Sequence, residues 1–425
     1  MKDSGIPWLE TIPNEWNICR LKDVGSLYGG LTGKSGDDFN VQESDNFSWF
    51  IPFTNIFNNS IIDKHKLQKV KIKEDESQNY VGNGDLLFLM SSEDIDGIGK
   101  SALLNEEIPN LCLNSFCKGF KTNKNKVNSI FLNYLMSSHI LRESIRMEAK
   151  GFIRINLRQD KLSSITILLP PLVEQKAIAD FLDRKCREID ELISLQERMI
   201  DELKAYKQSV ITEAVTKGLN PNAPLKDSGI EWIGEIPQHW KVLRIGIILQ
   251  AKAGGDAKPD LYSEYKDLQH PYPVYTNSNS AEQVYAYTSL PVFTEDAITV
   301  TGRGDIGKTF YRKGGFDAII RLLVMTPLTK LNLKYYMYFI GTVIPFLSDS
   351  AAVGQLSSKQ ISLYKTVFPP LSEQQEIADF LDKKCSEIDS LIELKQQKIE
   401  ELKEYRKSII YEYVTGKKEV EINEI

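Results

Sequence analysis

Two stretches of the chain, 170–216 and 369–415, carry nearly the same pattern of apolar and polar positions and align without a gap. Such an internal repeat decides how a chain is divided, so it is the first feature to find. After its opening Pro-Pro pair, neither copy contains Gly or Pro, and most of its residues are strong helix formers. Each copy is therefore predicted to be one long helix.

Apolar residues recur every seven positions in both copies, the spacing that is typical of a coiled coil. A helix of this length spans roughly 60–65 Å at ~1.5 Å per residue and needs a partner for its apolar face. We expect the two copies to pair with each other; the alternative is that each helix packs separately on its own domain. The predicted helix-pairing residues are Leu182, Ile189, Leu203, Val210, Leu381, Ile388, Leu402 and Ile409.

Two further details of the helices can be predicted. An interleaved apolar register should also face the partner helix, and Ser372 with Gln375 fits a capping box at the start of the second helix. The interleaved register contains Ile178, Leu192, Met199 and Tyr206 in the first copy, and Ile377, Leu391 and Tyr405 in the second.

A shorter repeat, which we call the box, precedes each variable stretch. The order of box, variable stretch and helix therefore occurs twice, with a turn-rich linker at 219–225. Strand-like runs such as 85–89 and 297–300 mix with helical runs at 129–149 and 332–347, which predicts α+β domains. The box residues are Lys2, Asp3, Ser4, Gly5, Ile6, Trp8, Ile12, Pro13 and Trp16, repeated as Lys226, Asp227, Ser228, Gly229, Ile230, Trp232, Ile236, Pro237 and Trp240. The predicted segments are a first domain at 1–169, a helix at 170–218, a second domain at 219–368 and a helix at 369–425.

Composition narrows the class of protein. A hydrophobic content of 42% and a charged content of 26% are typical of a soluble globular protein, and no apolar run suits a membrane span or a signal peptide. Five cysteines without metal-ligand spacing and four histidines argue against a metal site and favour the cytoplasm. The net charge of −6 for the whole chain would oppose nucleic-acid binding, but the acidic excess lies in the two long helices. The variable stretches are nearly neutral and could each present a basic face.

Each variable stretch has a glycine-rich loop after a predicted buried strand. Lys100 ends the loop of the first stretch, 96–100, and Arg303 and Lys308 lie in the loop of the second, 302–308. Cationic side chains beside such backbone suit contacts with DNA phosphates, and arginine can also read guanine. The plainer alternative is a tight turn with a solvated lysine. Neither loop has the GxxxxGK[ST] pattern of a phosphate-binding loop of nucleoside triphosphatases.

Other polar residues are further candidates for contact with DNA. Arg154 and Arg158 follow Gly151 in a basic segment that suits phosphate contacts. Asn55 and Asn277 lie in asparagine-rich segments and could read adenine, although such segments are more often turns. Lysines also recur in 64–73, and two arginines, Arg142 and Arg146, share a helix face for which solvation is the usual explanation.

Catalytic patterns are missing from the sequence. There is no Asn/Asp-Pro-Pro-Tyr/Phe element of an adenine methyltransferase, no Ser/His/Asp arrangement and no HExxH. Pro259-Asp260 with Glu264 and Lys266 mimics a nuclease pattern, but these carboxylates are too close in sequence to come from adjacent strands. We therefore predict no catalytic residues and no metal ligands.

Three features together resemble the specificity subunit of type I restriction-modification systems. They are the PPLxEQ…IADFLD pattern at 170–183 and 369–382, the two boxes, and the Ile-Gly-Lys ends of the glycine-rich loops at 98–100 and 306–308. The resemblance implies two target-recognition domains joined by an antiparallel helix pair. Each domain would read one half of a split, asymmetric DNA site, and the helices would set the spacing. It also implies an α+β fold and no cofactor in this chain.

The resemblance further implies partners for the chain: double-stranded DNA, two modification subunits that use S-adenosylmethionine, and restriction subunits that use ATP and Mg²⁺. Two alternatives are a stand-alone methyltransferase or nuclease, and a coiled-coil scaffold that does not touch DNA. Binding of S-adenosylmethionine by the chain alone would favour the enzyme, whereas a scaffold has no evident use for two different domains.

Overall fold

The structure is a computed structural model that describes residues 1–6, 9–42, 46–73, 76–151, 154–346 and 355–420. Backbone contacts divide the chain into two compact units. Unit 1 comprises Met1–Leu195 with Lys398–Ile425, and unit 2 comprises Gln196–Gln397. Each unit therefore contains one globular domain of strands and helices and parts of both long helices.

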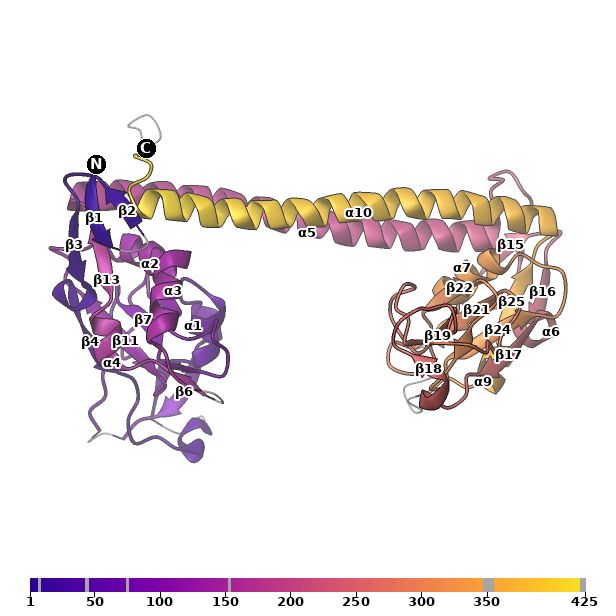
Figure 1. Cartoon of the computed structure of the whole chain (residues 1–425), viewed down its shortest axis with the longest axis horizontal. Helices are drawn as coiled ribbons and strands as arrows, with labels where there is room; N and C mark the ends of the chain where they lie inside the picture. Colours follow the sequence, from indigo (N-terminus) through magenta and orange to yellow (C-terminus); the bar gives the residue numbers. More distant parts are fainter. Residues whose placement is uncertain (7–8, 43–45, 74–75, 152–153, 347–354, 421–425) are drawn as a thin grey trace. The chain divides into compact units, whose positions relative to one another are not determined.

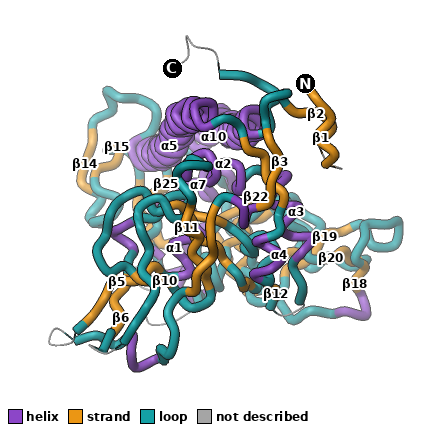
Figure 2. The backbone as a smooth tube through the Cα atoms, turned by 90° about the vertical axis from the view of Figure 1, so that its left-hand side faces the viewer, coloured by secondary structure: helices purple, strands orange, loops and turns teal. Residues whose placement is uncertain are grey.

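The long helices are α5 (Leu172–Lys217) and α10 (Leu371–Val414), as predicted. In unit 1, the first half of α5 pairs with the last part of α10, where the Phe181 and Tyr413 rings lie 4.4 Å apart. In unit 2, the last half of α5 pairs with the first part of α10, and Lys207 bonds to Asp389 at 2.7 Å. In both units the start of one long helix lies beside the end of the other, so the helix pair is antiparallel. This confirms the predicted pairing, and Figure 2 shows the two helices side by side.

The first apolar register faces inward as predicted. Leu182 and Leu381 are fully buried, and Ile189, Ile388 and Ile409 are 4% exposed. The other predicted helix-pairing residues are partly buried, namely Leu203, Val210 and Leu402.

The prediction for the interleaved register was wrong for four residues. Leu192, Tyr206, Leu391 and Tyr405 are between 46% and 56% exposed. From an inward residue such as Ile189, the next inward residue lies four positions later, at Ile193, and not three positions later, at Leu192. A seven-residue repeat permits a step of either three or four residues, and both of these positions are apolar, so the sequence does not show which residue faces the partner helix. The second inward row includes Ile193, Ile200, Ile392 and Ile399, which are buried or partly buried.

The glutamine of the PPLxEQ pattern holds the start of each long helix. Gln374 is 1% exposed; its amide donates to the Pro369 carbonyl at 2.8 Å and accepts from the Asn332 backbone at 2.9 Å. Gln175 makes the equivalent bonds to Pro170 and Asn128. The expected capping box at Ser372 was wrong, because α10 already begins at Leu371. The glutamine amide links each helix to the capping residue of α2 or α7 instead.

Each box contains a short hairpin, and the last tryptophan of the box, Trp16 or Trp240, is buried against the long helices. The hairpins are β1 (Lys2–Ile6) with β2 (Leu9–Ile12), and β14 (Leu225–Asp227) with β15 (Glu235–Pro237). The indole N–H of Trp16 donates to Glu174, and that of Trp240 donates to Glu373, each at 2.9 Å. The box residue Trp8 lies outside the described residues. The motif glutamates therefore anchor the boxes.

Each box also receives the end of a long helix from the other half of the sequence. In unit 1, a Cβ added to Gly416, which has φ of +70°, would come within 3.2 Å of the Trp16 ring. In unit 2, a Cβ on Gly218 would approach Trp240 to 3.3 Å. Both helices thus end in a left-handed glycine that packs on a box tryptophan.

The domain of unit 1 is built on an antiparallel sheet of order β4-β11-β7-β9, with buried β7 as predicted for 85–89 (Figure 1). The predicted helical run 129–149 breaks at Ser138 into α2 and α3. The strands of this sheet are β4 (Gly25–Gly29), β11 (Cys117–Thr122), β7 (Leu86–Leu89) and β9 (Ser101–Leu103). The other strands are β10 (Cys112–Leu113), β5 (Phe47–Ile51), β6 (Gln68–Lys71), β3 (Asn17–Arg20), β13 (Thr166–Leu169), β8 (Ser91–Ser92) and β12 (Ile155–Asn156). The helices are α1 (Phe53–Asn58), α2 (Ser129–Ser137), α3 (His139–Glu148) and α4 (Gln159–Ser163).

The domain of unit 2 has the equivalent sheet, β17-β24-β21-β22, with buried β21 as predicted for 297–300. The predicted helix at 332–347 is α7, which starts after the Asn332 cap and ends at Val343; position 347 lies outside the described residues. The strands are β16 (Lys241–Arg244), β17 (Leu249–Ala253), β18 (Tyr262–Ser263), β19 (Tyr272–Tyr275), β20 (Ala286–Thr288), β21 (Ala297–Val300), β22 (Thr309–Arg312), β23 (Asp317–Ala318), β24 (Leu323–Pro327) and β25 (Lys365–Phe368). The helices are α6 (Ile245–Ile248), α7 (Leu333–Val343) and α9 (Ser358–Leu363).

Sheets that carry helices on mostly antiparallel strands make both domains α+β, which confirms the predicted fold class. Among the helices of the described residues, none is long and apolar enough to cross a membrane.

Candidate nucleic-acid interface

The glycine-rich loop of unit 1 lies between β8 and β9 and ends at Lys100. Gly99 has φ of +65° and packs so closely on Ile145 that an added Cβ would lie 2.3 Å from that side chain. The Lys100 ammonium donates to the Phe57 carbonyl at 3.1 Å and lies 4.0 Å from the centre of the Phe57 ring. Lys100 is therefore held in the domain rather than extended into solvent, and its contact with DNA stays a prediction.

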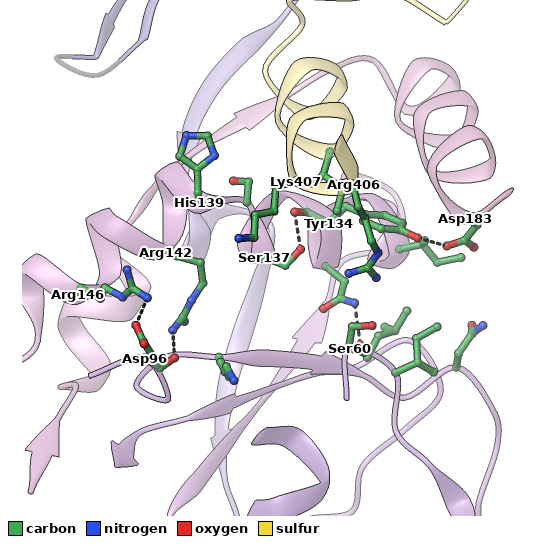
Figure 3. Close-up of a pocket in the computed structure, with 18 residues that line it drawn as sticks. Ser60, Asp96, Tyr134, Ser137, His139, Arg142, Arg146, Asp183, Arg406 and Lys407 are labelled. Carbon is green, nitrogen blue, oxygen red and sulfur yellow. Dashed lines mark hydrogen bonds and ion pairs between the residues drawn. The ribbon is translucent and has the colours of Figure 1, made fainter. Parts of the chain in front are cut away.

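Lys100 lines a cavity of about 640 Å³ in unit 1. Figure 3 shows side chains from α2, α3, the glycine-rich loop and the end of α10 converging on this cavity. Its charged side chains are Lys100, Arg142, Arg146, Arg406, Lys407, Asp96 and Asp183. We call this cavity the cationic pocket.

The expectation of a solvated face for Arg142 and Arg146 was wrong for Arg142. Arg146 forms ion pairs with Asp96 and Glu143. Arg142 is only 9% exposed and donates to the Asp96 backbone carbonyl at 2.8 Å. The glycine-rich loop covers this part of α3 and shields Arg142 from water. The i, i+4 spacing of the two arginines does not reveal this contact.

In unit 2, the structure brings Asn277 and Arg303 into direct contact. The Asn277 carboxamide oxygen accepts from the backbone of Gly302 at 2.8 Å and of Arg303 at 3.3 Å. The Arg303 guanidinium donates to Gln355, and Lys308 is exposed at the end of the same loop. Asn277 therefore lies against the loop that carries Arg303 and Lys308, and the three predicted residues are neighbours on one surface.

Backbone strain marks the same region of unit 2. Ile320 and Arg321 have φ of 53° and 61°, a left-handed conformation that is costly for residues other than glycine. The Asn277 amide donates to the Ile320 carbonyl at 2.7 Å. Asn277 therefore acts first as a clamp that joins two loops, which orders the surface around Arg303.

The remaining candidates of unit 1 differ in their access to solvent. Asn55 is 1% exposed, and its carboxamide bonds to the backbone N–H and carbonyl of Asp63, so it stabilises a loop and does not face a ligand. The Arg154 guanidinium is exposed and lies 4.6 Å over the Phe116 ring. The Arg158 side chain is 77% exposed and bonds to Asp160. Of these three, Arg154 and Arg158 can reach a ligand.

A further exposed cluster of unit 1 was predicted only in part, because the lysine run 64–73 includes Lys69 but the aromatic residues beside it were not singled out. Phe47 and Trp49 on β5 are 40% and 39% exposed, and Lys69 on β6 lies 4.3 Å and 5.4 Å from their ring centres. Trp49 and Lys69 are cross-strand partners. The alternation in 47–51 was the available signal, because residues two apart share a face of a strand. Exposed aromatic and lysine side chains on one face suit contact with DNA.

The described residues contain no group of three or more His, Cys, Asp or Glu side chains that could hold a metal ion. The nuclease-like residues Pro259 and Asp260 lie in a short 3-10 helix, Pro259–Leu261. That this pattern is accidental stays an interpretation of the sequence.

Comparison with known proteins identifies the family. The family model for the type I restriction modification DNA specificity domain matches residues 13–205 and 237–404. The type I restriction enzyme MjaVIII specificity subunit of Methanocaldococcus jannaschii is 24% identical over 96% of this chain and 93% of its own length. The EcoKI specificity subunit of Escherichia coli is 28% identical, over 59% of this chain and 52% of its own length.

Solved structures have the same fold. A chain from a structure of complex assembly in a type I R-M system gives a TM-score of 0.76 at 15% identity and covers 96% of this chain and 99% of that one. The HsdS subunit of Thermoanaerobacter tengcongensis gives a TM-score of 0.57 at 17% identity over 98% and 100%. Because the family model spans most of both halves, the chain belongs to the type I restriction-modification DNA specificity family, as the non-catalytic subunit that gives the complex its DNA specificity and carries no cofactor of its own.

Proposed function

We propose that each unit reads one half of a split, asymmetric DNA site and that the helix pair sets the distance between the halves. One observation carries this proposal. The long helices and boxes are nearly identical in the two halves, down to the buried glutamines and the tryptophan–glutamate bonds, whereas the domain loops differ. A common frame with two different loop surfaces suits two different half-sites.

The segment boundaries follow from this division of labour. In the proposal, 1–169 and 219–368 are the two target-recognition domains, with a linker at 219–225, and 170–218 and 369–425 are the helical spacers. The contacts with DNA come from Arg154, Arg158 and Lys100 in the first domain, and from Arg303, Lys308 and Asn277 in the second. Exposed or loop-borne cations position a protein on phosphates, and arginine can read guanine.

The outward side chains of the long helices suit docking of two modification subunits. Leu192, Leu195 and Tyr206 of α5 are more than 40% exposed, and so are the equivalent residues of α10, Leu391, Leu394 and Tyr405. Exposed apolar residues that recur in both copies favour two copies of one partner. The modification and restriction subunits would supply the sites for S-adenosylmethionine, ATP and Mg²⁺, and the complex would act in the cytoplasm, where its DNA lies.

Sequencing of methylated sites tests this function. A host expressing the modification subunits with this chain should carry a two-part methylated motif that is missing without the chain. Replacing 241–368 with the matching segment of a relative should change one half of that motif only. Inserting one heptad into both helices should lengthen the spacer between the halves. An unchanged spacer would contradict the role of the helices in spacing, and no methylated motif at all would contradict DNA recognition.

A further inference from the structure

The cationic pocket of unit 1 has more positive than negative side chains. Five cations line it, whereas its lining acids are only Asp96 and Asp183. Both carboxylates already have partners, because Asp96 pairs with Arg146 and Asp183 accepts from the Tyr134 hydroxyl at 2.8 Å. The acids of the lining therefore leave an excess of positive charge (Figure 3).

Three of the five cations are compensated by carboxylates. Arg146 pairs with Asp96 and Glu143, Arg406 lies 3.4 Å from Asp190, and Lys407 lies 2.6 Å from Glu404. Within the described chain, Arg142 and Lys100 have no such ion pair and bond instead to backbone carbonyls. Arg142 and Lys100 are thus the two lining cations that no described carboxylate contacts directly, although Asp96 is close enough to act on the charge of both.

Arg142 is the more deeply buried of the two. Nine-tenths of the residue is shielded from solvent, and its NH1 nitrogen has no hydrogen-bond partner among the described residues. Burial, followed by the charge of Arg146, lowers the pKa of Arg142 to about 10. Burial and the charge of Arg142 also lower the pKa of Lys100. A buried cation without a counter-ion is costly, so an anion in this pocket would relieve both desolvation and repulsion.

The chemistry of the two cations selects the kind of anion. A guanidinium offers several donors in one plane and matches the oxygens of a phosphate group, and a lysine ammonium binds phosphate as a point charge. The cavity of about 640 Å³ is large enough for such a group. The loop glycine of unit 2, Gly307, packs instead on the ring of Phe346, and the lysine after it is exposed. The arrangement is therefore specific to unit 1.

We propose that the cationic pocket binds a phosphate group through Arg142 and Lys100. The group is either a phosphodiester of the DNA backbone or a free phosphate. Binding of the DNA backbone rests on the proposed DNA recognition, whereas binding of free phosphate does not. The proposed phosphate site and the proposed DNA recognition can therefore fail separately.

Calorimetric titration of the full-length chain with orthophosphate, at constant ionic strength in chloride, tests the site. We expect saturable binding that weakens roughly tenfold or more in Arg142→Gln, because a hydrogen bond to a charged group is lost, and by less in Lys100→Gln. Lys22→Gln removes an exposed cation of unit 1 outside the pocket and should bind like the parent chain. Absence of saturable binding, or binding that both pocket variants retain in full, would overturn the proposal.

Two further measurements separate loss of the binding site from loss of charge or of folding. Arg142→Lys keeps the charge but loses the planar set of donors, so it should bind phosphate more weakly than the parent chain and more tightly than Arg142→Gln. Circular dichroism then shows whether each variant is folded, and Lys100→Gln provides the test if Arg142→Gln is not.

Competition distinguishes the two sources of phosphate. The chain is assembled with its modification subunits and bound to duplex DNA that contains the methylated motif. If orthophosphate and duplex displace each other in the parent chain but not in Arg142→Gln, the pocket binds the DNA backbone. If both bind together and orthophosphate binding still depends on Arg142, the pocket is a site for free phosphate. If the host that expresses the chain shows no methylated motif although the chain binds orthophosphate, only the proposed DNA recognition is contradicted.

Discussion

Units 1 and 2 are built on one frame but present different loop surfaces. In the frame, Tyr134 donates to Asp183 at 2.8 Å, and Tyr338 donates to Asp382 at 2.9 Å, so each domain is tied to its long helix by the same bond. The loop surfaces differ, since unit 1 has the cationic pocket and unit 2 has the strained segment at Ile320. The two halves of the chain therefore share their buried anchors and differ in the loops that these anchors support.

Paired substitutions in the helix cores should have the largest effect and should show whether the two frames are equally strong. Leu182→Ala and Leu381→Ala each remove a fully buried side chain, in unit 1 and unit 2 respectively. Each should lower the free energy of unfolding by about 2–5 kcal/mol, as measured by chemical denaturation. Leu192→Ala and Leu391→Ala, at exposed positions of the same helices, serve as controls. A loss below about 1 kcal/mol at either buried leucine would contradict the equivalence of the frames.

The motif glutamines allow a sharper comparison with a smaller effect. Gln175→Ala and Gln374→Ala leave buried backbone groups without partners, which should cost about 1–3 kcal/mol each in the same measurement. Gln175 also donates to the Lys126 carbonyl at 3.2 Å, so the loss in unit 1 should be the larger of the two. The exposed Gln375→Ala is the matched control. Equal stability of parent and buried-glutamine variants would show that these bonds are replaced by water.

The four buried cysteines should show the smallest difference between the units, because their thiols are shielded in both. Burial raises the pKa of Cys117 to about 12 and of Cys112 to about 11, and it also raises the pKa of Cys186 and Cys385. A thiol reagent at pH 8 should therefore react slowly with the native chain and fully after denaturation.

The same pKa shifts give a direction for stability against pH. Unfolded thiols ionise near the ordinary value of 9.0, below the raised values of the folded state. The contribution of these thiols to stability is therefore complete below about pH 9 and falls as the pH rises toward 12. Denaturation midpoints that rise between pH 9 and 11 would contradict this sign, and rapid labelling of the native chain at pH 8 would contradict the burial.

The repeat, the two long helices and the α+β class could be predicted because they depend on periodic sequence and on helix-breaking residues. The choice between Leu192 and Ile193 as the inward residue could not, since both are apolar and only the packed partner decides. Arg154 and Arg158, predicted to contact phosphates, are exposed, so their contact with DNA stays a prediction that the structure permits. Residue type failed as a guide for Asn55, which is held by the backbone of Asp63 eight residues later, and for Arg142, which is covered by a loop 46 residues earlier in the sequence.

The border between the units cuts both long helices, at Leu195/Gln196 and Gln397/Lys398, and this has a consequence for how such a protein can arise. Neither half of the sequence completes a unit alone: the box tryptophan of unit 1 receives Gly416, and that of unit 2 receives Gly218. A half-length ancestor with one box, one domain and one helix would carry both complementary surfaces, and two molecules could complete each other by exchanging helix ends. Fusing that symmetric pair into one polypeptide yields the present arrangement and frees each reading surface to evolve without altering its twin.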